Sequence, residues 1–100
     1  MNMAKIDPIH PGEVLAEDFM KPLGLSSNAL AQKLGVPANR ISAIVGRRRD
    51  ISPDTALRLE RAFGSSAEFW LNLQARFDLE TARDQIDKKE LSSIKAIQAA

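Results

Sequence analysis

The sequence predicts an all-α protein of five helices, in which the fifth helix is the longest and a short C-terminal tail follows. Its 100 residues are the size of one typical domain, which we expect to span residues 1–87. The tail at residues 88–100 is expected to be either a frayed helix or disordered. No stretch alternates apolar and polar residues as a half-buried strand does. Residues that start and stop helices recur instead, with apolar residues at helical spacing between them.

The composition is that of a soluble globular protein, with 44% hydrophobic and 27% charged residues. There is no cysteine and only one histidine, which argues against disulfides, thiol catalysis and metal sites built from these residues. The chain also lacks a Ser/His/Asp arrangement and a glycine-rich phosphate loop. We therefore expect no enzyme activity, no cofactor and no metal. The absence of a membrane span or signal-peptide core favours a cytoplasmic protein.

The first helix is expected to begin at Pro11, whose fixed φ angle suits the first helical position. Glu13 follows in the first turn, where its charge is favourable against the helix dipole. Pro22 is expected to end this helix near Met20. The apolar stripe consists of Val14, Leu15 and Phe19. His10, next to Pro11, is interpreted as a helix-start residue bonded to the backbone.

Two short helices are expected next. The first is capped by Ser26 or Ser27 and ends at Gly35, and the second covers residues 38–45 and ends at Gly46. The residues expected to lock the two helices together are Leu30, Leu34, Val36, Ile41 and Ile44.

The fourth helix has Ser52 as its N-cap and Pro53 as its first residue, and it ends at Gly64. Its apolar face is expected to consist of Ala56, Leu57, Leu59 and Phe63. The fifth helix should cover about residues 66–86. Its apolar residues spread over more than one stripe, which predicts burial on two sides. We expect Phe69 and Leu73 to lie in the core.

Positive charge is concentrated in one segment. Five Lys or Arg residues and one Asp give residues 27–50 a net charge of +4, within a chain whose net charge is +1. A local basic patch of this kind is typical of a surface that faces phosphates, although a solvated charged face is as plausible from charge alone.

Residues 27–46 have the layout of a helix-turn-helix motif, with the sequence SNALAQKLGVPANRISAIVG. Ala31 stands where the two helices cross, and a small side chain there lets the backbones approach. Gly35 takes the turn position that requires a positive φ angle. The alternative is an αα-hairpin in a helical bundle, which shares the apolar residues but does not require this Ala and Gly spacing or a basic loop after it.

The sequence LAQKLGVPANRIS, followed by GRRRDISPDTALRLERAFG, resembles lambda-repressor-like helix-turn-helix domains of the XRE/cro type. With HPGEVL near the N-terminus and SAEFWLNLQARFDL near the end, residues 8–87 resemble HigA-like antitoxins, also called VapI-type. The resemblance implies a five-helix DNA-binding domain that dimerises and represses its own operon. It also implies that the protein neutralises a small basic toxin, a RelE-like enzyme that cleaves mRNA. Solitary regulators without a toxin share the same features, and a helical protein-interaction module is a third alternative.

The third helix is the expected reading helix, because the second helix of such a motif lies in the DNA major groove. Asn39 can pair bidentately with adenine, and Arg40 can contact guanine or a phosphate. The full set of expected base-reading residues is Ala38, Asn39, Arg40, Ser42 and Ala43. The expected phosphate contacts are Ser26, Ser27, Gln32, Arg47, Arg48 and Arg49.

One reading helix covers few base pairs, so we expect a homodimer on a near-palindromic operator. The expected dimer surface on the fifth helix consists of Trp70, Phe77 and Leu79. The acidic face of the first helix suits a basic toxin, although a solvated helix face is the alternative. Its residues are Glu13, Glu17 and Asp18.

Overall fold

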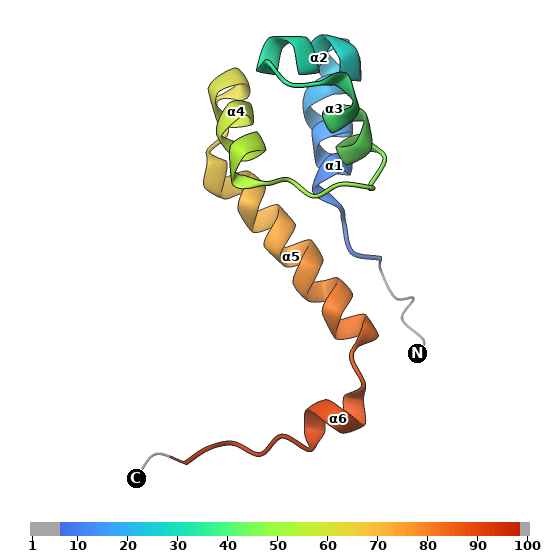
Figure 1. Cartoon of the computed structure of the whole chain (residues 1–100), viewed down its shortest axis with the longest axis vertical. Coiled ribbons are helices and arrows are strands. Elements are labelled where there is room, and N and C mark those ends of the chain that lie inside the picture. The colour runs from blue at the N-terminus through green and yellow to red at the C-terminus, as the bar shows by residue number, and fades with distance from the viewer. Residues whose placement is uncertain (1–6, 99–100) are drawn as a thin grey trace.

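The computed structural model describes residues 7–98, and every regular element in this range is helical, as the sequence predicts (Figure 1). Parts of the expected domain and tail, residues 1–6 and 99–100, lie outside the described residues. The elements in chain order are α1 (Pro11–Val14), η1 (Leu15–Met20), η2 (Lys21–Leu23), α2 (Ser27–Leu34), α3 (Ala38–Val45), α4 (Pro53–Phe63), α5 (Ala67–Gln85) and α6 (Lys88–Ser92).

The first helix starts as predicted and then changes geometry. His10 is its N-cap, and the ring Nδ1 accepts a hydrogen bond of 2.9 Å from the backbone N–H of Gly12. From Leu15 to Met20 the helix has π geometry, which the sequence does not signal, and a 3₁₀ turn containing Pro22 follows. The i→i+5 pattern brings Leu15 and Met20, five residues apart, onto the same buried face.

The helix-turn-helix pair α2 and α3 forms as the sequence predicts. The hydroxyl of Ser26 accepts a hydrogen bond from the N–H of Ala29, so Ser26 rather than Ser27 is the N-cap of α2. Gly35 ends α2 with φ of 72°, a conformation in which a Cβ would be strained. Ala31 is buried between the helices. The core that these helices share with their neighbours includes Leu15, Leu30, Ile41, Ile44, Leu59 and Trp70.

Helix α4 has the expected cap, because the Ser52 hydroxyl accepts a hydrogen bond from the N–H of Thr55. Its expected apolar face is only partly correct. Ala56 and Leu59 are fully buried, but Leu57 is 59% exposed. Leu57 precedes Leu59 by two residues, about 200° around the helix, and therefore points away from the core.

Helix α5 corrects three further expectations: its burial on two sides, the place of Phe69 in the core, and the place of Trp70 on the dimer surface. It is not buried on two sides, because Trp70 and Gln74 are its only fully buried residues among those described, and its second half extends away from the helical body (Figure 1). Phe69 is 37% exposed, whereas Trp70 is completely buried. A side chain in the core of one protomer cannot also form a dimer surface, so the assignment of Trp70 to that surface is wrong.

The C-terminal segment carries the short helix α6 at Lys88–Ser92, and residues 88–98 are exposed throughout. Within the range that the structure describes, no helix is long and apolar enough to cross a membrane.

Candidate nucleic-acid interface

The reading helix α3 presents a small polar face to solvent. Ala38, Asn39 and Ser42 are exposed and Ala43 is half-buried, while Ile41 and Ile44 face the core. The amide of Asn39 forms no hydrogen bond within residues 7–98, and the Ser42 hydroxyl donates only a long bond of 3.4 Å to the carbonyl oxygen of Asn39. These two side chains are therefore available to an external partner.

Arg40 does not lie on this exposed face. Its Nη1 donates a hydrogen bond of 2.6 Å to Oδ2 of Asp54 in α4, and its side chain is only 22% exposed. Its Nε is buried and has no hydrogen-bond partner within residues 7–98. The structure thus places Arg40 against α4, whereas the sequence assigned it to the bases. Nothing in the spacing predicts this pair, because Arg40 and Asp54 are 14 residues apart.

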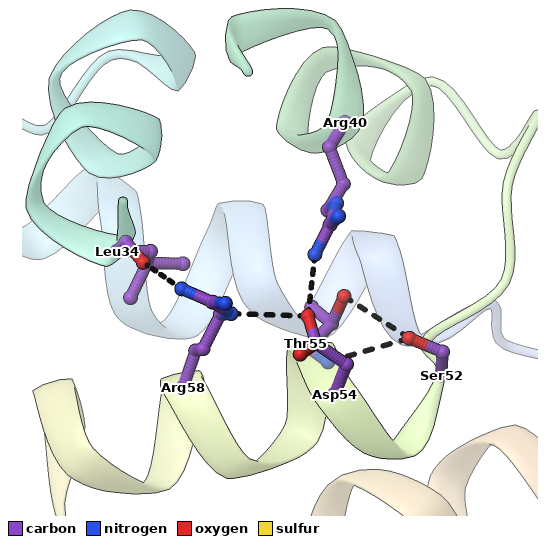
Figure 2. Close-up of polar contacts among 6 residues, drawn as sticks. All are labelled: Leu34, Arg40, Ser52, Asp54, Thr55 and Arg58. Carbon is purple, nitrogen blue, oxygen red and sulfur yellow. Dashed lines mark hydrogen bonds and ion pairs between the residues drawn. The ribbon is translucent and has the colours of Figure 1, made fainter. Parts of the chain in front are cut away.

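Asp54 also belongs to a wider polar network that joins three helices (Figure 2). The same Oδ2 accepts a bond of 3.0 Å from Nε of Arg58, and Nη1 of Arg58 donates a bond of 2.8 Å to the carbonyl oxygen of Leu34. The bonds from Arg58 and Arg40 lower the pKa of the Asp54 carboxyl. The network connects the end of α2 and the first turn of α3 to α4. The i,i+4 spacing of Asp54 and Arg58 was visible in the sequence.

The loop after α3 carries the densest positive charge. Arg47 adopts a left-handed backbone with φ of 63°, the position at which helices usually place glycine. The N–H of Arg48 reaches back to the carbonyl oxygen of Ala43 over 2.8 Å and completes the turn. Arg48 and Arg49 are exposed and form no ion pair within residues 7–98, while Arg47 lies 3.4 Å from a carboxylate oxygen of Glu13.

The N-terminal end of α2 is the other expected phosphate contact. The oxygen of the Ser26 hydroxyl accepts the capping hydrogen bond, but its O–H can still donate. This hydroxyl and the backbone N–H groups of the first turn are therefore the available donors there. Ser27 is half-buried and Gln32 is exposed.

The acidic residues of the first helix are exposed, but two of them are paired. Glu13 faces Arg47, and Glu17 lies 3.6 Å from Lys21. Asp18 forms no ion pair in the described part of the chain.

Phe77 and Leu79 lie in the exposed half of α5. Phe77 is half-buried with its ring edge-on to His10 at 4.8 Å, and Leu79 is 52% exposed. Helix α5 also borders a cavity of about 350 Å³, whose lining combines apolar and charged side chains: Asp7, Ile9, Val14, Leu73, Arg76 and Glu80.

His10 is a structural residue. It is buried beneath Phe77, and this burial lowers the pKa of the imidazole. The neutral ring is the form that accepts the Gly12 N–H, and its Nε2 lies 4.0 Å from a carboxylate oxygen of Asp50. This confirms the interpretation of His10 as a residue that starts a helix.

Comparison with known proteins agrees with this geometry. Residues 17–70 match the helix-turn-helix family. The chain is 50% identical over 86 residues to Virulence-associated protein I of Dichelobacter nodosus, covering 86% of this chain and 78% of that protein. It is 35% identical over 89 residues to Antitoxin HigA-1 of Vibrio cholerae, covering 89% of this chain and 84% of that protein. The solved structure of Pseudomonas aeruginosa antitoxin HigA with the higBA promoter superposes with a TM-score of 0.86 at 42% identity, covering 91% of this chain and 99% of that one.

The chain therefore belongs to the helix-turn-helix family, among its HigA-like members. The expected lambda-repressor-like fold is confirmed, and members of this family are regulators rather than enzymes.

Proposed function

We propose that this protein is a sequence-specific DNA-binding antitoxin that represses its own operon as a dimer and neutralises an mRNA-cleaving, RelE-like toxin. The observation that carries the DNA-binding part is the polar face of α3, where Asn39 and Ser42 are exposed. The loop after α3 adds Arg48 and Arg49, which have no ion-pair partner among the described residues. A relative of known structure is bound to promoter DNA.

In this proposal, Asn39 hydrogen-bonds to one base and Ser42 hydrogen-bonds to a neighbouring base. Ala38 and Ala43 make apolar contacts with thymine methyl groups. The phosphates are held by Arg47, Arg48 and Arg49, by Gln32, and by the N–H groups of the first turn of α2 near Ser26 and Ser27. Arg40 is removed from the base-reading set because Asp54 holds it. The left-handed backbone of Arg47 supports a role in binding, since strained residues persist mainly at functional sites.

The dimer surface is proposed to contain Leu79, which is 52% exposed, and the half-buried Phe77. A second apolar surface would stabilise these exposed apolar side chains by excluding water from them. Two reading helices would then engage half-sites about 34 Å apart.

The toxin surface is proposed to be the acidic face of the first helix. Asp18 has no ion-pair partner in the part of the chain that the structure describes, and Glu13 and Glu17 are exposed enough to exchange their present cationic partners for those of a basic toxin. The alternative is a solitary regulator with the same DNA interface and no toxin. Two relatives of this chain, from Escherichia coli and Haemophilus influenzae, are named as uncharacterized HTH-type transcriptional regulators.

The first experiment measures binding to the upstream region of the protein's own gene and to a shuffled duplex of equal length, at several salt concentrations. A sequence-specific regulator should prefer its operator by about 1,000-fold or more. Equal binding to both duplexes contradicts the proposed function.

The second experiment co-expresses the chain with the neighbouring open reading frame and tests whether the two purify together. The double variant E17K/D18K should lose the partner, while E68K, a charge reversal on α5, should retain it. Recovery of the wild-type protein with operator DNA but without a partner favours the solitary regulator.

A further inference from the structure

We propose that Asp54 is a specificity-determining residue, which withholds Arg40 and Arg58 from DNA phosphates and so weakens binding to non-operator sequences. This inference rests on the proposed DNA-binding function. Both arginines converge on one carboxylate oxygen, with distances of 2.6 Å from Arg40 Nη1 and 3.0 Å from Arg58 Nε (Figure 2).

The group formed by Arg40, Asp54 and Arg58 lies beside the proposed DNA-binding face. Arg40 is the third residue of the reading helix, and Asp54 lies in the first turn of α4, immediately after the basic loop. An arginine in the first turn of α3 is close enough to the duplex to reach a phosphate if its side chain is released. Asp54 instead turns this guanidinium toward the protein body.

The hydrogen bonding of the Arg40 guanidinium is incomplete in this conformation. Its Nε is buried and has no hydrogen-bond partner among the described residues, so its present conformation leaves one charged donor unsatisfied. Arg58, in contrast, has a second anchor at the carbonyl oxygen of Leu34. Loss of the Asp54 carboxylate should therefore free Arg40 more readily than Arg58.

The consequence for specificity follows from how the two kinds of complex are held together. Non-operator binding consists almost entirely of phosphate contacts and can adapt its position to a released arginine. The operator complex is fixed in position by base contacts, which limits what a released arginine can reach. Loss of the Asp54 charge should therefore strengthen non-operator binding more than operator binding.

The test compares the wild-type protein with D54N, R40Q and the double variant R40Q/D54N on the operator and the shuffled duplex. For D54N we expect about tenfold tighter binding to the shuffled duplex at low salt, and a salt dependence steeper by about 0.9 for each additional phosphate that the protein neutralises. Operator affinity should rise by less than about threefold, so the specificity ratio falls. R40Q/D54N should lose most of this increase in shuffled-duplex affinity.

A charge-matched control is E68Q, which removes one negative charge from the first turn of α5. This variant should leave both affinities within about twofold of wild type, because Glu68 does not hold an arginine of the reading helix. If E68Q and D54N tighten shuffled-duplex binding equally, net charge alone accounts for the effect and the proposal is overturned.

Failure of the proposed function and failure of this inference give different results. Equal binding of the wild-type protein to both duplexes contradicts sequence-specific regulation, whereas unchanged shuffled-duplex binding by D54N contradicts only the role of Asp54. If D54N does not fold, R40Q decides the question, since an arginine held away from DNA can be replaced with less than about threefold loss of operator affinity. Loss of discrimination at one base pair in R40Q would show that Arg40 reads that base.

Discussion

Gly12 of α1 lies directly against the backbone carbonyl of Ile44 in the reading helix. A Cβ placed on Gly12 would be 1.8 Å from the carbonyl oxygen of Ile44 and 2.7 Å from its carbonyl carbon. Both are backbone atoms of a packed helix, so they cannot move aside as a flexible side chain can. The absence of a side chain at Gly12 therefore sets how closely the first helix approaches α3.

Gly12→Ala should lower the free energy of unfolding by about 3 kcal/mol, the cost of forcing extra volume into a packed contact. The control is Gly24→Ala, the same substitution at a residue with φ of 63°, where no atom of the described residues beyond its chain neighbours lies within 4 Å of the added Cβ. That variant bears only the left-handed backbone penalty of about 1 kcal/mol. Urea unfolding measures both. A Gly12→Ala loss no larger than that of Gly24→Ala would show that α1 and α3 separate easily.

The pH dependence of stability should contain a contribution from His10. Burial lowers its folded-state pKa below the usual 6.5, and the charged groups that act on it are Asp50, Asp78 and Arg47. Below pH 6.5 the unfolded chain therefore binds a proton that the folded protein does not, and stability falls as the pH falls from 6.5 through the folded-state pKa. Above pH 6.5 this contribution is constant.

The matched variant for this prediction is His10→Asn, because an asparagine oxygen can still cap the Gly12 N–H but does not titrate. Urea unfolding between pH 7.5 and 5.5 should show a smaller decline for His10→Asn than for wild type, even if the variant is less stable at every pH. If the free energy of unfolding declines equally for both proteins, protonation of His10 does not destabilise the fold.

The boundaries of the fold were predictable because they depend on local chemistry. Ser26, Ser52 and Ser66 each cap a helix through their own hydroxyl, and Gly35 and Gly64 end helices in left-handed conformations. These effects act within four residues, so a single sequence contains all the information they need. The helix-turn-helix unit was predictable as well, because α2 and α3 are neighbours in the sequence and a short turn joins them.

The errors occurred where distant parts of the chain decide the outcome. Apolar type alone could not distinguish buried Trp70 from exposed Phe69, because the core has room for only one face of α5. The Arg40–Asp54 pair depends on how α4 packs against α3, so the sequence left Arg40 free to face DNA. The π geometry of η1 likewise has no local signal in the sequence.

Arg48→Ala should weaken binding to all duplexes by a similar factor, because a phosphate contact is made regardless of sequence. The plot of log affinity against log salt concentration should become shallower by about 0.9 if one phosphate contact is lost. Arg83→Ala provides a control of equal charge change near the end of α5, where no effect on the slope is expected. An Arg48→Ala defect confined to one base pair would identify a base contact instead.

Asn39→Ala should change the sequence preference of binding rather than its salt dependence, in contrast to Arg48→Ala. It removes the amide that can pair with adenine, so discrimination at one operator base pair should fall by about 1–3 kcal/mol while the salt dependence stays unchanged. Asn28→Ala, a change to an exposed asparagine on α2, is the control. Affinities for operators substituted at each position in turn provide the measurement, and an unchanged preference at every position removes Asn39 from the base-reading set.

Leu79→Ser should shift the protein toward monomers if α5 carries the dimer surface. Leu79 is 52% exposed, so its replacement should cost the dimer the burial of a leucine, about 2 kcal/mol. This cost corresponds to roughly a 30-fold rise in the dissociation constant for each copy that is buried. The control is Leu57→Ser, since Leu57 is 59% exposed on α4 and lies outside the proposed surface. Sedimentation equilibrium distinguishes the two, and operator affinity should fall only for Leu79→Ser because paired half-sites require a dimer. Equal effects of both substitutions, or a wild-type protein that remains monomeric at high concentration, would place the dimer surface elsewhere.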